Sequence, residues 1–163
     1  MAKSAQLQIR VTPEQKQRIK EKAYRTGEDV SQWVLSRLLP DCADELQSMV
    51  DVLASNPKTR RYTLAELHDY FVSEDSNQLG QAFELLDCSA LEPLESNYVA
   101  AMIETACTNR NIAPPSWLSS IAPLTDPWFA TRLRSLKVYL LTASPPAFRR
   151  RNLFVDSTLG ARV

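Results

Sequence analysis

The chain has 163 residues, which is enough for one medium domain or two small ones with a core. It holds 19 basic and 19 acidic residues and is 44% hydrophobic, which excludes both a uniformly basic nucleic-acid coat and a disordered chain. Only 3 glycines occur, where an average usage of about 7% would give roughly 11. This shortage favours helices over turn-rich β folds.

Cysteine usage and hydropathy predict the compartment in which the protein is located. The 3 cysteines form an odd set without a Cys-x-x-Cys pair, so we expect neither a disulfide framework nor a zinc site. The first ten residues lack the apolar run of a signal peptide, and no apolar stretch approaches the ~20 residues that a membrane span needs. We therefore expect a cytoplasmic protein that does not contact a membrane.

The zero net charge hides an uneven distribution along the chain. Residues 1–40 carry eight basic and four acidic groups, residues 41–142 carry seven and fourteen, and residues 143–163 carry four and one. A basic head, an acidic body and a basic tail predict at least two surfaces with different partners.

The first predicted element is a half-buried strand over residues 5–11, where apolar and polar residues alternate. One face carries Leu7, Ile9 and Val11, and the other carries Gln6, Gln8 and Arg10.

Two short helices follow the strand. Thr12 and Pro13 are typical of a helix start, and Gly27 is typical of a helix end. A second start at Asp29 predicts another helix, which ends before Pro40. One strand and two short helices cannot close a core, and a lone strand leaves its backbone groups unpaired. The simplest remedy is a second copy whose strand pairs antiparallel with the first.

Residues 5–40 resemble the ribbon-helix-helix family of the Arc and methionine repressors. The resemblance implies a dimer whose two-stranded ribbon enters the major groove and reads bases with Gln6, Gln8 and Arg10. Glutamine can pair with adenine and arginine with guanine, which suits that role. The alternative is an edge strand of some other small α/β unit, with these polar side chains merely solvated.

The same resemblance implies phosphate contacts at the start of the second helix, from Ser31, Gln32 and backbone N–H groups. Lys3 is expected to contact phosphate as well. Asp29 departs from the pattern, because a carboxylate repels phosphate. We expect it to cap the helix and point away from the DNA.

After Pro40 the apolar spacing predicts about five helices that share one core over residues 43–143. The first expected helix carries the apolar residues from Leu46 to Leu53, and the second starts at a capping box from Thr63 to Glu66. The third carries Leu79 to Leu86, the fourth carries Tyr98 to Ala106, and the fifth starts at Asp126-Pro127. Between the last two, residues 112–128 crowd two tryptophans among four prolines. This segment either folds back onto the helices or presents a recognition surface.

The basic tail is expected to leave the helical body in an extended form, because Pro145 and Pro146 stop the preceding helix. Aromatic anchors beside arginines are typical of interface hot spots. The predicted partner-binding residues are Phe148, Arg149, Arg150, Arg151, Asn152 and Phe154. The alternative is a solvated basic tail, which would expose several large apolar side chains.

Residues 112–156 also resemble the C-terminal part of antitoxins encoded beside nucleotidyltransferase-like toxins. The resemblance is carried by Pro115-Ser116-Trp117, Asp126 to Phe129, Leu133-Arg134 and, most specifically, the run from Ser144 to Val155. It implies that the six predicted partner-binding residues of the tail bind the cognate toxin.

The chemistry-bearing residues do not predict an enzyme. His68 is the single histidine, and no glycine-rich phosphate loop or spaced carboxylate motif occurs. We expect no catalysis, no cofactor and no bound metal.

The sequence thus predicts a mainly α protein with a ribbon-helix-helix unit at 1–40, a helical bundle at 41–143 and an Arg-rich tail at 144–163. The interpretation is a type II antitoxin and autorepressor that binds a palindromic promoter site as a homodimer or higher even oligomer and neutralises a toxin. One alternative is a regulator with a ligand-sensing or oligomerising body. Another is a plasmid mobilisation accessory protein that places a relaxase on DNA.

Overall fold

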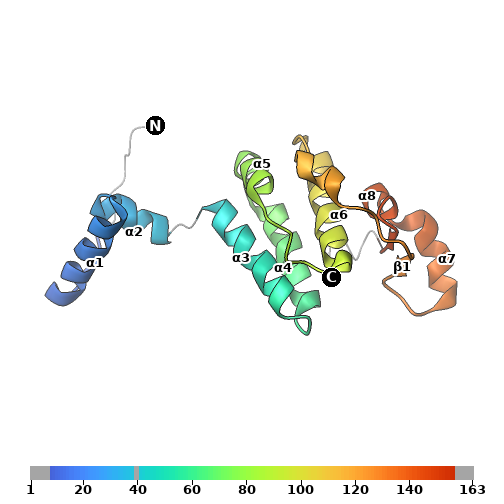
Figure 1. Cartoon of the computed structure of the whole chain (residues 1–163), viewed down its shortest axis with the longest axis horizontal. Helices are drawn as coiled ribbons and strands as arrows, with labels where there is room; N and C mark the ends of the chain where they lie inside the picture. Colours follow the sequence, from blue (N-terminus) through green and yellow to red (C-terminus); the bar gives the residue numbers. More distant parts are fainter. Residues whose placement is uncertain (1–7, 39–40, 157–163) are drawn as a thin grey trace. The chain divides into compact units, whose positions relative to one another are not determined.

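The computed structural model describes residues 8–38 and 41–156, which divide into two compact units between Asp41 and Cys42. The described part of the chain is mainly helical, as the sequence predicts (Figure 1). The N-terminal unit, called the head below, holds α1 (Pro13–Thr26) and α2 (Val30–Leu38). The second unit, called the body, holds α3 (Cys42–Ser55), α4 (Arg60–Ser73), α5 (Ser76–Leu85), α6 (Pro93–Arg110), η1 (Ser116–Ser120), β1 (Trp128–Phe129), α7 (Arg134–Ala143), α8 (Pro146–Arg149) and β2 (Leu153–Phe154).

Helix α1 begins and ends as its sequence predicts. The Gln15 amide donates to Thr12 Oγ1 over 3.2 Å, and the Thr12 amide donates back to Gln15 Oε1 over 2.9 Å, which completes a capping box. At the other end Gly27 adopts a left-handed φ of 75°, and its N–H donates to the carbonyls of Ala23 and Tyr24. The sharp turn after α1 therefore depends on glycine.

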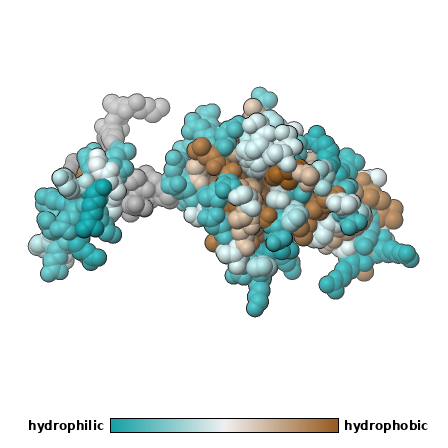
Figure 2. Space-filling model, in the orientation of Figure 1, coloured by the Kyte–Doolittle hydropathy of each residue, from teal (hydrophilic) through white to brown (hydrophobic). Residues whose placement is uncertain are grey.

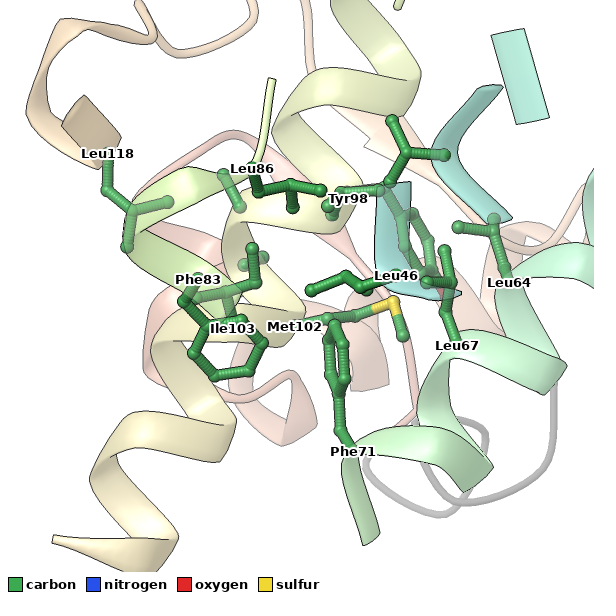
Figure 3. Close-up of a cluster of buried hydrophobic side chains, with 14 of the residues drawn as sticks. Leu46, Leu64, Leu67, Phe71, Phe83, Leu86, Tyr98, Met102, Ile103 and Leu118 are labelled. Atoms are coloured by element: carbon green, nitrogen blue, oxygen red, sulfur yellow. The ribbon is translucent and has the colours of Figure 1, made fainter. Parts of the chain in front are cut away.

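Helices α3 to α6 enclose one hydrophobic core. Figure 3 shows side chains from these helices and from η1 converging on it. The fully buried members include Leu46, Leu53, Leu67, Leu79, Phe83, Val99 and Ile103. The predicted apolar faces of α3, α5 and α6 are confirmed, apart from Leu85, which is 74% exposed. Helix α6 ends at Arg110 because Asn111 takes a left-handed φ of 55°.

The proline- and tryptophan-rich segment folds back onto this core. Trp117 donates its indole N–H to the Phe83 carbonyl over 2.8 Å, and Leu118 is buried. Ile112, Ile121 and Leu124 pack against the core as well. Of the two predicted alternatives, the fold-back is the correct one.

Two predicted helix starts are wrong. Helix α4 begins at Arg60, so Thr63 lies inside its first turn, and its hydroxyl bonds the Thr59 carbonyl instead of capping. No helix begins at Asp126; α7 begins eight residues later, at Arg134. The intervening Trp128 and Phe129 form a short strand, because a distant segment supplies their partner.

That partner is the predicted tail. Strands β1 and β2 pair in parallel, with Trp128 opposite Leu153 and Phe129 opposite Phe154. The Trp128 amide donates to the Asn152 carbonyl over 2.8 Å, and the Phe129 and Phe154 rings stack with centroids 4.8 Å apart. Helices α7 and α8 form the crossover that a parallel pair requires.

Within the described ranges, no helix is both long and apolar enough to cross a membrane, and no cluster of three or more His, Cys, Asp or Glu residues could hold a metal ion.

Candidate nucleic-acid interface

The head has almost no core of its own. Among residues 8–35, whose burial the structure describes, Ala23 is the one buried side chain, at 1% exposure. Large apolar side chains stay at the surface, namely Ile9 at 58%, Val11 at 42%, Val30 at 41% and Leu35 at 37%. Ile19 and Trp33 are half-buried. Burial this limited, within the described part of the head, offsets little of the entropy that ordering two helices costs.

The structure describes only part of the predicted strand. Residues 5–7 lie outside the described residues, and residues 8–11 have no strand pairing. The physical reason is that a lone strand has no edge to pair with, since both helices of the head satisfy their own backbone groups. The strand therefore stays a prediction, because the partner expected for it is the strand of a second copy.

The predicted base-reading side chains are accessible where the structure describes them. Gln8 and Arg10 are both exposed, on the segment that leads into α1. Gln6 and Lys3 lie outside the described residues. Arg10 lines a groove on the described part of the head, together with residues of α1 and α2.

This groove has a volume of about 460 Å³ and combines positive charge with apolar surface. Its lining residues are Arg10, Val11, Gln15, Arg18, Ile19, Lys22 and Trp33. Lys22 Nζ lies 6.0 Å from the centre of the Trp33 ring, within cation–π range. Arg18 and Lys22 were not among the residues predicted to bind DNA, although their spacing of four residues places them on one side of α1.

The start of α2 is capped by its own carboxylate. Asp29 Oδ1 accepts the Ser31 amide over 2.7 Å and the Gln32 amide over 3.1 Å. The expectation that Asp29 caps this helix is confirmed. The same two amides are the ones that would hold a phosphate, so in the free chain Asp29 occupies that position. Phosphate binding by the exposed Ser31 and Gln32 stays a prediction.

The second predicted site, in the tail, is largely buried. Phe148 is 2% exposed, Phe154 is 9% and Arg151 is 7%. The prediction of an extended tail is wrong for residues 144–156, because these side chains complete the body's core. Asn152 adopts a left-handed φ of 58° and donates its amide to the Leu124 carbonyl over 2.6 Å.

The buried Arg151 side chain forms hydrogen bonds with the backbone of the proline-rich segment. Its guanidinium donates to the Leu118 carbonyl over 3.2 Å and to the Ile121 carbonyl over 3.4 Å. Burial lowers the pKa of Arg151, although nearby Glu104 opposes that shift.

Of the six predicted tail residues, the arginines at 149 and 150 are exposed. Arg150 is paired with Glu104 over 2.9 Å. The tail therefore does not offer the aromatic anchors expected of it.

The head has the parts of a ribbon-helix-helix unit: a basic, extended lead-in, a capped helix, a glycine turn and a second helix. A family model agrees with this class over residues 1–46. The matching family is described as NikA-like, Mobilization protein NikA, and is a ribbon-helix-helix family. The match covers less than a third of the chain and does not reach the body beyond α3. Searches of curated proteins and of solved structures gave no match.

Proposed function

We propose that the chain is a DNA-binding protein of the mobilization type, in which two heads form one ribbon-helix-helix unit. The observation that carries the proposal is that the head leaves its large apolar side chains exposed, with Ala23 the one buried side chain among residues 8–35. The family match to a mobilization protein over residues 1–46 supports the same reading.

A second head supplies what the first one lacks. Its strand would pair antiparallel with the first, satisfying backbone groups on both. Pairing would bury Ile9 and Val11, which are now 58% and 42% exposed, at about 25 cal/mol per Å² of apolar area. The polar face of the ribbon would then carry Gln6, Gln8 and Arg10 toward the base edges of the major groove.

The charge of the head suits this partner. Residues 1–40 carry eight basic and four acidic groups, and Arg18 and Lys22 lie on an accessible side of α1. Such groups neutralise phosphates and make affinity fall steeply with salt. The acidic body is a poor DNA ligand, so we expect its surface to meet another protein rather than the DNA. In mobilization, that partner is the relaxase that nicks the DNA.

Repression of the chain's own promoter is compatible with DNA binding by the head. Toxin neutralisation through the tail is not part of this proposal, because Phe148 and Phe154 are already committed to the core. Nothing in the described structure favours an antitoxin over a mobilization protein.

Footprinting on the DNA of the chain's own locus tests the proposal. Full-length protein should protect two related half-sites upstream of its gene or at a transfer origin. Arg10→Ala should weaken specific binding by ~1–3 kcal/mol and relax the preference at one base pair. The control Lys16→Ala, an exposed α1 position, should weaken all sequences about equally and reduce the salt dependence. Binding by Arg10→Ala that matches the wild type in strength and sequence preference would contradict the proposal.

A further inference from the structure

A cavity of about 390 Å³ lies within the body, where the first turns of α4 and α6 meet the region of β1. Arg60 and Arg61 are the first two residues of α4, and Glu95 belongs to the first turn of α6. Figure 2 shows apolar surface scattered among hydrophilic surface on the face of the body in view, so exposed apolar side chains alone do not mark a site. This cavity is distinguished by its concave shape and its charge.

The cavity carries an unbalanced positive charge. Among the described residues, the charged side chains that line it are two arginines and one glutamate. Glu95 is buried, and its carboxylate forms an ion pair with Arg60 and accepts the Glu92 amide over 3.0 Å. Arg61 is exposed, and its side chain has no ion-pair or hydrogen-bond partner within the described ranges. The cavity is thus basic although residues 41–142 carry twice as many acidic as basic groups.

The position of the two arginines is unfavourable for the helix that holds them. A helix N-terminus carries partial positive charge, so basic side chains in the first turn of α4 are repelled. That turn has no acidic residue, and Thr59 before it makes no side-chain capping bond in the described chain. Arg60 Nε is buried and also lacks an acceptor among the described residues. An anion in the cavity would offset the charge that Glu95 leaves unbalanced.

The remaining lining of the cavity is apolar and aromatic. Leu64 and Tyr98, both labelled in Figure 3, are buried. Trp128 is half-buried and meets Tyr98 edge-on, with ring centroids 6.3 Å apart. Apolar walls with a few charged groups are typical of small-molecule sites, whose volumes run from about 300 to 1,000 Å³. The volume of this cavity therefore suits a ring-sized ligand.

We propose that the cavity binds a small organic anion in which an apolar ring bears a carboxylate or a phosphate group. The ring lies against Tyr98 and Trp128, and the anionic group lies at Arg61. Arginine suits both anionic groups, because its planar guanidinium can donate two parallel hydrogen bonds to either. The inference goes beyond DNA binding and does not depend on the dimer of heads, since every lining residue belongs to the body.

A fluorescence titration of the full-length protein with 8-anilinonaphthalene-1-sulfonate tests the proposal. This dye joins aromatic rings to an anion, and its sulfonate stands in for the carboxylate or phosphate. Arg61→Ala should weaken dye binding about tenfold, as expected for the loss of a hydrogen bond to a charged group. Arg61→Lys, which keeps the charge, should weaken it less. The matched control Arg149→Ala, another exposed arginine of the body, should leave dye affinity unchanged.

A second variant fills the cavity without changing its charge. Ala130 is an exposed lining residue, so Ala130→Trp should abolish the dye binding that depends on Arg61. Dye binding that neither Ala130→Trp nor Arg61→Ala reduces would overturn the site. A loss with Ala130→Trp but not with Arg61→Ala would overturn the preference for an anion. A melting temperature close to that of the wild type shows that each variant is folded. If Ala130→Trp does not fold, Arg61→Ala at its exposed position decides alone.

Competition for the bound dye distinguishes the two anionic groups. 1-Naphthoate should displace the dye at a concentration about tenfold lower than 1-naphthalenemethanol, which has the same ring and no charge. Adenosine 5′-monophosphate presents a ring and a phosphate. Stronger displacement by naphthoate assigns the site to a carboxylate, and stronger displacement by the nucleotide assigns it to a phosphate. Equal displacement by naphthoate and the uncharged alcohol, with none by the nucleotide, would overturn the proposal.

Discussion

At the residue scale, Arg151 shows how a charged side chain became part of the core. It lies in a run of three arginines, and its neighbours Arg149 and Arg150 are exposed. Arg151 alone turns inward, donating to the carbonyls of Leu118 and Ile121. It thereby satisfies backbone acceptors that the proline-rich segment cannot pair within itself.

This role predicts different costs for two adjacent arginines. Arg151→Ala should destabilise the body by ~2–4 kcal/mol, because it leaves buried carbonyls without donors and opens a cavity. Arg149→Ala should change the free energy of unfolding by less than about 0.5 kcal/mol, as expected for an exposed position. Urea unfolding followed by circular dichroism measures both. Equal costs for the two substitutions would show that the buried bonds of Arg151 do not stabilise the fold.

At the scale of elements, the segment from α8 to β2 closes the body. Phe148 meets the Tyr98 ring edge-on at 5.2 Å, and Leu153 and Val155 are fully buried. These contacts join the end of the chain to α6, far away in sequence. The segment therefore belongs to the folding unit and is not an appendage.

Truncation distinguishes a structural tail from a binding tail. Deleting residues 144–163 should unfold the body, seen as a lower melting temperature and loss of the cooperative transition, because Phe148, Leu153 and Val155 leave the core. Deleting only residues 157–163 is the matched control and should leave the melting temperature within a few degrees of wild type. A body that melts normally without residues 144–163 would restore the interpretation of a free tail.

The elements also show what the sequence could and could not predict. Local signals predicted α1 and α3 well, because the Thr12 cap and the apolar spacing from Leu46 to Leu53 act within a few residues. The strand at Trp128 was missed because its partner, Leu153, lies 25 residues later and pairing depends on the tertiary fold.

The candidate site, like the fold, could be predicted from the sequence only in part. Asp29 could be predicted as a cap from its residue type alone. The groove beside Arg10 could not, because it depends on how α1 and α2 pack together and bring Lys22 near Trp33.

At the scale of the whole molecule, the two units differ in how completely each closes its core. The body buries a continuous cluster from α3 to β2, whereas the described part of the head buries Ala23 and leaves Ile9 and Val11 open. The body closes its core within one chain. The head is expected to close its core by pairing with the head of a second copy. The central claim is therefore the head dimer.

Sedimentation equilibrium of the full-length chain at micromolar concentration tests that claim most directly. Wild-type protein should have twice the chain mass of 18.4 kDa. The double variant Ile9→Asp and Val11→Asp should have the mass of one chain, with the helical signal of its body retained, because charge on the ribbon's apolar face prevents pairing. A wild-type chain of 18.4 kDa, or a double variant that remains a dimer, would contradict the account.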